Sequence, residues 1–185
     1  MNWRKFDIDI TIYPSDCAMN ERIHPSIITR ICDQGLPSWC APHLYFGDFD
    51  GRYLPVISEW SWAGDWGSAY YHASKIAPSC MVLGVAQEGN PIVILPNDPS
   101  IYLFSPDGMR IEKLNSSIDE MTAFLYAFTE MIEEAVMENE NAFSENTIRT
   151  ALIDSFIAKI SAYASQKECN IWKTWAIQKG VNAVQ

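Results

Sequence analysis

Hydrophobic and polar residues alternate with a short period through the middle of the chain. Apolar, β-branched runs occupy 81–86 and 91–95, and a Glu-Gly-Asn turn separates them. Glycine and asparagine tolerate the positive φ of a tight hairpin, so these two runs are expected to pair antiparallel. Two further runs, 101–104 and 109–114, flank a Ser-Pro-Asp-Gly turn with proline at its second position. The pattern predicts two consecutive hairpins.

The period changes to that of a helix directly after the second hairpin. Ser117 and Glu120 have capping-box spacing, in which the serine hydroxyl accepts from the N–H of Glu120 and the glutamate carboxylate reaches back. Apolar residues then repeat every three or four positions: Met121, Phe124, Leu125, Phe128, Ile132, Ala135 and Val136. They form one stripe along about five turns, which predicts a helix lying on a face of the sheet.

The amino-terminal third gives shorter signals. Isoleucine alternates with polar residues over 8–12, which indicates a half-buried strand or an extended arm. A short helix is predicted to begin at Pro25 and to end at Gly35. Residues 44–60 have the pattern of a hairpin around an Asp-Gly turn. Pro55 cannot donate to a ladder, so the second strand is expected at a sheet edge or at a bulge.

The carboxyl-terminal third is predicted to be helical. Ser144 is the expected cap of a helix whose apolar side carries Ile148, Leu152, Phe156, Ile160 and Tyr163. A last helix with Trp172 and Trp175 is expected from about Asn170.

The chain contains no repeat or linker that divides it. We therefore predict one α+β domain over 1–185, with a twisted, mainly antiparallel meander sheet packed on one face by helices. Residues 138–185 form its helical extension.

The charge balance narrows the class of partner. The chain has 185 residues, with 13 Lys and Arg against 23 Asp and Glu, giving a formal net charge of −10. A phosphate backbone or an anionic membrane surface would repel most of such a molecule. The composition therefore argues against nucleic-acid and membrane partners and favours a partner with a basic surface.

The five cysteines indicate reduced thiols. They are odd in number and lack CxxC spacing, and the amino terminus has no apolar run typical of a signal peptide. The three histidines have no ligand-like spacing. We expect a cytoplasmic protein with no cofactor and no metal site.

Three segments, taken in order, carry a family resemblance. They are the helix that runs into Gly35-Leu36-Pro37, the aromatic strand Leu44-Tyr45-Phe46-Gly47, and the strand pairs that lead into Asn115-Ser116-Ser117 before an apolar helix. This order resembles the SUKH superfamily, whose fold is shared by a fungal cell-wall synthesis regulator and many bacterial immunity proteins. The resemblance covers roughly residues 20–137.

The resemblance implies a non-enzymatic bacterial immunity protein. Such a protein binds a cognate polymorphic toxin inside the producing cell and neutralises it by occluding its active cleft. These toxins are commonly nucleases or nucleic-acid deaminases. The acidic composition agrees with this role, because an enzyme that grips nucleic acid has a basic cleft that carboxylates can occupy.

Two acidic groups are the candidate partner surfaces. The first surrounds the predicted 44–60 hairpin and comprises Asp48, Asp50, Glu59 and Asp65. Its carboxylates suit a partner's arginines, a metal ion or glycoside hydrolysis, and ordinary turn and solvent roles are the alternative. The second group lies on the predicted long helix and comprises Glu130, Glu133 and Glu134. The ordinary interpretation of this second group is a solvated helix face.

A tryptophan-rich segment leaves other functions open. Trp60, Trp62 and Trp66 suit stacking on a sugar or an anchor in an interface, and burial in the core is the alternative. The segment favours a small-ligand or carbohydrate-binding module as a second hypothesis. A third is a hydrolase that uses a pair of the acidic residues named above. The main hypothesis predicts no catalytic residue.

Overall fold

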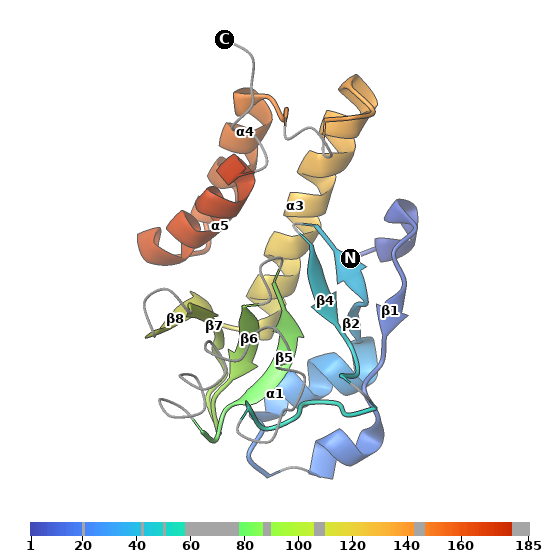
Figure 1. The fold of residues 1–185 in the computed structure, drawn as a ribbon, viewed down its shortest axis with the longest axis vertical. Coiled ribbons are helices and arrows are strands. Elements are labelled where there is room, and N and C mark those ends of the chain that lie inside the picture. The colour runs from blue at the N-terminus through green and yellow to red at the C-terminus, as the bar shows by residue number, and fades with distance from the viewer. Residues whose placement is uncertain are drawn as a thin grey trace.

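The main sheet has six antiparallel strands in the order β3-β4-β5-β6-β7-β8. Figure 1 labels its strands β4 to β8 in the lower part of the view. The structure is a computed structural model that describes residues 1–19, 21–41, 43–49, 51–57, 78–86, 90–105, 110–142 and 147–178. The strands are β3 (Trp39–Cys40), β4 (Leu44–Phe46), β5 (Met81–Val85), β6 (Pro91–Ile94), β7 (Ile101–Ser105) and β8 (Arg110–Asn115). Both predicted hairpins are confirmed, since β5 pairs with β6 and β7 pairs with β8.

Both faces of the sheet centre are buried. The larger core cluster includes Met81 and Ile92 with the apolar side of the long helix, whereas the neighbouring residues Val82 and Val93 belong to a smaller cluster. Successive strand residues point to opposite faces, so the two clusters lie on opposite sides of the sheet. The smaller cluster is completed by Phe49 and by other apolar residues from the sheet and from the chain before β5.

Helix α3 (Ile118–Glu138) follows the sheet directly and begins at the predicted cap. The hydroxyl of Ser117 accepts a hydrogen bond from the N–H of Glu120 at 3.1 Å. The Glu120 carboxylate reaches back to the N–H of Ser116 at 2.7 Å, one residue before the cap. Phe124 and Phe128 are buried against the core, which confirms that this helix covers the sheet.

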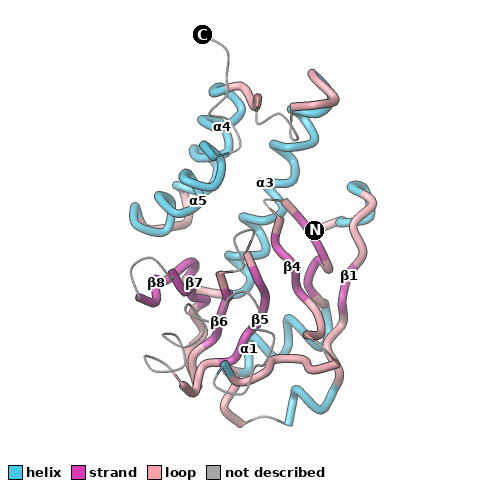
Figure 2. The backbone as a smooth tube through the Cα atoms, viewed as in Figure 1, coloured by secondary structure: helices cyan, strands magenta, loops and turns pink. Residues whose placement is uncertain are grey.

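The carboxyl-terminal helices pack on α3 rather than on the sheet alone. They are α4 (Thr150–Ser161) and α5 (Gln166–Gln178), which Figure 2 draws in cyan beyond α3 with loops between the helices. Ring centroids lie 5.1 Å apart for Phe128 and Phe156 and 5.6 Å apart for Phe124 and Trp172. These aromatic contacts join the three helices into one layer.

Two details of the predicted carboxyl-terminal helices were wrong. Tyr163 is exposed because α4 ends at Ser161, before the apolar period reaches this residue. The last helix begins at Gln166 rather than near Asn170. The proposed cap Ser144 lies outside the described residues.

The amino-terminal segment builds a second, two-stranded sheet. Its elements are η1 (Trp3–Phe6), β1 (Ile10–Thr11), η2 (Ser15–Met19), α1 (Pro25–Ile28), the π-helix η3 (Thr29–Gln34) and β2 (Leu36–Pro37). β1 pairs antiparallel with β2, so the isoleucine alternation produces only a short strand. Gly35 ends the helical segment with φ of 74°, and a Cβ there would lie 2.6 Å from the carbonyl oxygen of Thr11. Only glycine fits this turn without a shift of the backbone.

The predicted hairpin over 44–60 is only partly correct. Phe49 and Arg52 form an isolated bridge, but β4 pairs with β3 and β5 instead of with the chain after the turn. Leu54 has φ of 50° and the next residue is Pro55, which has no N–H to donate. The chain therefore leaves the ladder and bridges the start of β5, where the Val82 N–H donates to the Pro55 carbonyl oxygen at 2.9 Å.

Two further properties follow from the described residues. None of the five cysteines is joined to another in a disulfide. Within the described chain no helix combines the length and the apolar character needed to cross a membrane.

Candidate functional site

One face of α3 remains open to solvent and forms the floor of a groove. Its residues repeat at alternating three- and four-residue intervals beside the buried stripe: Glu120, Ala123, Ala127, Glu130, Glu134 and Met137. Residues at this spacing lie along one side of a helix. Residues of η1 line only the carboxyl-terminal half of the groove, and residues of α4 line the amino-terminal half. Lys159 of α4 lines both halves.

The carboxyl-terminal half of the groove is an acidic cavity of about 350 Å³. The structure brings together here the whole second acidic group predicted from the sequence: Glu130, Glu133 and Glu134. Lys5 Nζ lies 2.9 Å and Lys159 Nζ 3.8 Å from oxygens of Glu130. Within the described chain no basic side chain pairs with Glu133 or Glu134. Two of the three carboxylates are therefore available to a partner's cations.

The η1 wall is held on α3 by aromatic packing. The ring centroid of Tyr126 lies 5.2 Å from that of Trp3 and 5.1 Å from that of Phe6. Lys5 Nζ lies 4.5 Å from the centroid of the Phe6 ring, a cation–π distance. The hydrogen bond to Glu130 raises the pKa of Lys5, so this lysine stays charged beside the cavity. The wall is thus fixed by both apolar and ionic contacts.

The amino-terminal half of the groove is an apolar cavity of about 250 Å³. Its lining is mostly aliphatic and aromatic: Ala123, Phe124, Ala127, Ile160 and Tyr163. Glu120 lies at one end, where its Oε2 accepts the Ser116 N–H but its Oε1 is buried with no hydrogen-bond partner. Burial raises the pKa of Glu120, and the nearby charge of Glu168 adds to this effect. An unmet acceptor therefore borders an apolar cavity.

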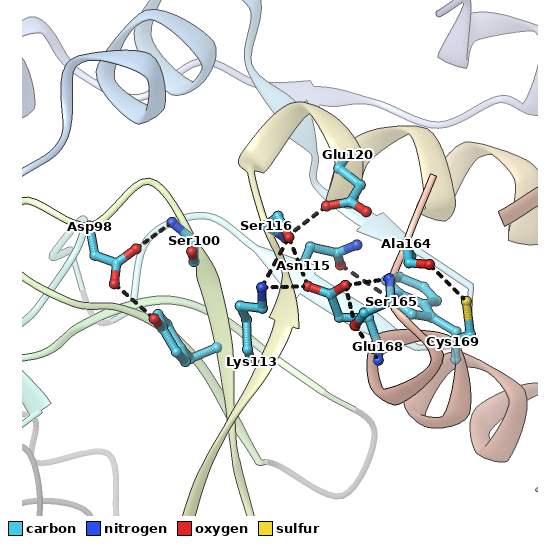
Figure 3. A network of polar contacts seen from close by, with 12 residues as sticks. Asp98, Ser100, Lys113, Asn115, Ser116, Glu120, Ala164, Ser165, Glu168 and Cys169 are labelled. Carbon is cyan, nitrogen blue, oxygen red and sulfur yellow. Dashed lines mark hydrogen bonds and ion pairs between the residues drawn. The ribbon is translucent and has the colours of Figure 1, made fainter. Parts of the chain in front are cut away.

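Figure 3 shows a polar network that includes Glu120, at the end of the apolar half of the groove. The Glu168 carboxylate accepts hydrogen bonds from the Ser116 hydroxyl at 2.9 Å and from the Ser165 N–H at 2.8 Å. Lys113 Nζ lies 3.0 Å from the same carboxylate. Burial alone would raise the pKa of Glu168, but these hydrogen bonds outweigh it and lower the pKa from 4.5 to about 2. The network joins β8, the start of α3 and the start of α5.

The first acidic group is described only at Asp48. This residue is exposed just beyond β4 and does not line the groove. The other members, Asp50, Glu59 and Asp65, lie outside the described residues, as do the tryptophans Trp60, Trp62 and Trp66. The interpretation of these six residues stays a prediction.

The structure adds residues that the sequence interpretation missed. Lys5, Glu120 and Lys159 line the groove, and only the helical spacing of Glu120 from Glu130 gave a signal for its place there. An exposed aromatic pair, Trp39 and Tyr45, also lies beside Asp48, where the two residues face each other across β3 and β4. The period of two along a strand places Tyr45 on the opposite face from Leu44 and Phe46, and this was the signal for its exposure.

Carboxylates, two lysines and apolar side chains make up the lining of the groove. No group of three or more histidine, cysteine, aspartate or glutamate side chains that could hold a metal ion occurs among the described residues. Comparisons of the chain with family models, with curated proteins and with solved structures give no match. The groove is therefore the feature from which a function is inferred.

Proposed function

We propose that this chain is a non-enzymatic immunity protein of the SUKH type that binds and neutralises a cognate polymorphic toxin in the cytoplasm. The toxin is a nuclease or a nucleic-acid deaminase, and the bound immunity protein occludes its active cleft. The observation that carries the proposal is the groove on α3, which places unpaired carboxylates beside an apolar floor on a chain of net charge −10.

The groove suits a basic segment of a partner protein. Arginine and lysine have apolar stems and charged ends, so a stem can lie on Ala123 and Ala127 while the charge reaches a carboxylate. Glu120 supplies a carboxylate at the end of the apolar half. Glu133 and Glu134 would meet further cations at the acidic end. Basic clefts that grip nucleic acid supply such cations, and complementary charge speeds association.

The architecture agrees with what the family resemblance implies. A helical segment running into Gly35-Leu36-Pro37, an aromatic strand, a β-meander and a capped apolar helix follow one another in the described chain. The floor of the α3 groove belongs to that last helix, whereas its walls come from η1 and α4, outside the segments that carry the resemblance.

Coexpression with a toxin tests the proposal. The chain is produced together with the toxin domain encoded beside its gene, and both cell growth and recovery of a complex are measured. Rescue of growth together with a stable complex is the expected result. A toxin that stays active and forms no complex contradicts the proposal.

Charge reversal locates the surface. Glu133→Lys combined with Glu134→Lys should slow association with the toxin domain by about tenfold and weaken its salt dependence, because two attractive charges become repulsive. Asp154→Lys combined with Glu21→Lys is the matched control, since both residues are exposed and neither lines the groove. Equal effects of the groove and control variants would contradict the assignment of the surface to α3.

A further inference from the structure

A second cavity, of about 240 Å³, has a different chemistry from the groove. It is lined by Met1, Asn2, Trp3, Arg4, Ile10, Arg30 and Gln34. Both of its charged side chains are arginines, although the chain as a whole carries 13 basic and 23 acidic residues. The cavity therefore presents positive charge on an otherwise acidic molecule.

Arg30 is the unusual residue of this cavity. It is only 9% exposed, and its Nε is buried with no hydrogen-bond acceptor. Its Nη1 donates to Gln34 Oε1, four residues later in the π-helix. π-Helical turns are frequent at functional sites. A buried donor without an acceptor costs free energy, so a native structure that keeps one needs an explanation.

The charge of Arg30 is also incompletely balanced. Its nearest carboxylate is that of Asp119, with Oδ1 at 3.6 Å from Nη1, and the Asp119 side chain is 70% exposed. This distance is longer than that of a charge-assisted hydrogen bond. Burial lowers the pKa of Arg30, and Asp119 offsets the effect only in part. A guanidinium remains charged in proteins, so its surroundings favour an added anion.

We infer that this cavity binds a small oxyanion, a carboxylate or a phosphate, through Arg30 with Arg4 at its rim. The planar fork of a guanidinium matches two oxygens of either anion, and the unpaired Nε supplies one of the two donors. The amide nitrogen of Gln34 carries further donors, because its Oε1 already accepts from Arg30. No residue lines both this cavity and the α3 groove.

The test follows the Arg30 Nε–H directly by NMR. The full-length, ¹⁵N-labelled protein is titrated in separate arms with inorganic phosphate and with acetate, and sodium chloride holds the ionic strength constant. Saturable movement of the Arg30 Nε–H resonance in either arm is the expected result, and the arm with the tighter binding identifies the preferred oxyanion. The proposal is overturned if this resonance moves no more than that of Arg110 in both arms.

Variants separate binding from folding. Arg30→Lys removes the planar fork and should weaken binding by about tenfold. Arg30 is buried, so the second variant changes the exposed residue Arg4. Arg4→Gln should weaken oxyanion binding by about threefold and leave the fold unchanged. Arg110→Gln is the control, because Arg110 lies on β8. This variant should bind the oxyanion as tightly as the original protein does. Equal affinity of all three variants for the preferred oxyanion would also overturn the site.

Discussion

Glu168 is the single side chain on which the described helical layer depends most clearly. It is 1% exposed, and its two oxygens accept from Lys113, Ser116 and Ser165. A buried carboxylate is costly unless it is fully hydrogen-bonded, and here the hydrogen bonds come from three separate elements. The charge of this residue therefore stabilises the position of α5 against the sheet and α3.

Acid should remove this contribution. The pKa of Glu168 is about 2 in the folded protein and lies below its ordinary value of 4.5, so the folded state favours the ionised form. Its stabilisation is complete above pH 4.5 and is lost as the pH falls from 4.5 towards 2. Urea unfolding between these pH values should show a steeper loss of stability for the original protein than for Glu168→Gln.

The same variant tests the network at neutral pH. Glu168→Gln should lower the free energy of unfolding by roughly 2–3 kcal/mol, below the range for a fully buried pair because Lys113 is partly exposed. Glu140→Gln is the control, since Glu140 is exposed just after α3. A Glu168→Gln protein as stable as this control would contradict the structural role of the network.

Gly84 makes a second prediction for a single residue. A Cβ at this position would lie 2.6 Å from Phe46 Cδ1 and 2.8 Å from the carbonyl oxygen of Tyr45. The backbone oxygen cannot move without disturbing the pairing of β4 with β5. Gly84→Ala should lower the free energy of unfolding by roughly 1–3 kcal/mol, and Gly84→Val by more, measured by chemical denaturation. Equal stability of all three proteins would contradict the close approach of the strands.

Among the helices and strands, α3 is stabilised by the hydrogen bonds at its first turn. Ser117 caps α3, the helix that covers the sheet and carries the groove. Ser117→Ala should lower the free energy of unfolding by about 1 kcal/mol, because the N–H of Glu120 loses its acceptor. The exposed, mid-helix variant Ser155→Ala should cause little change, since alanine has the highest helix propensity. Thermal unfolding monitored by circular dichroism compares the two, and equal losses would contradict the capping role.

Capping signals also show where the sequence was informative about the fold. The Ser117 and Glu120 spacing predicted the start of α3 correctly, because a cap depends on residues close in sequence. Ser165 and Glu168 form a fully reciprocal capping box, in which Glu168 Oε2 accepts the Ser165 N–H and the Ser165 hydroxyl accepts the Glu168 N–H at 3.4 Å. This pair marks the start of α5 at Gln166, ahead of the predicted start near Asn170.

Other elements depend on contacts between distant residues. The partner of β4 is β5, about 40 residues later, and the local Asp-Gly turn gave no information about that pairing. The π-helical geometry of η3 likewise has no simple sequence signal. In the candidate site, the spacing of the acidic residues on α3 was visible in the sequence. The ion pairs of Lys5 and Lys159 with Glu130 form only through tertiary packing, so the sequence gave no signal for them.

In the whole molecule, the α3 groove combines negative charge with a concave, partly apolar surface. The chain has a net charge of −10, and the groove combines unpaired carboxylates with an apolar floor between η1 and α4. Its two ends carry the most exposed large side chains of the groove, Met137 at 83% and Tyr163 at 81%. An exposed apolar residue in each half is what a protein-binding surface needs in addition to charge.

Hydroxyl-radical footprinting of the chain, alone and bound to its toxin domain, tests the central claim most directly. Methionine and aromatic side chains report their own exposure, so Met137 and Tyr163 serve as probes of the groove and Trp39 as a probe of the sheet edge. Binding in the α3 groove should lower the oxidation of Met137 and Tyr163 and leave that of Trp39 unchanged. Protection of Trp39 with no change at Met137 and Tyr163 would place the partner on the sheet edge and contradict the account.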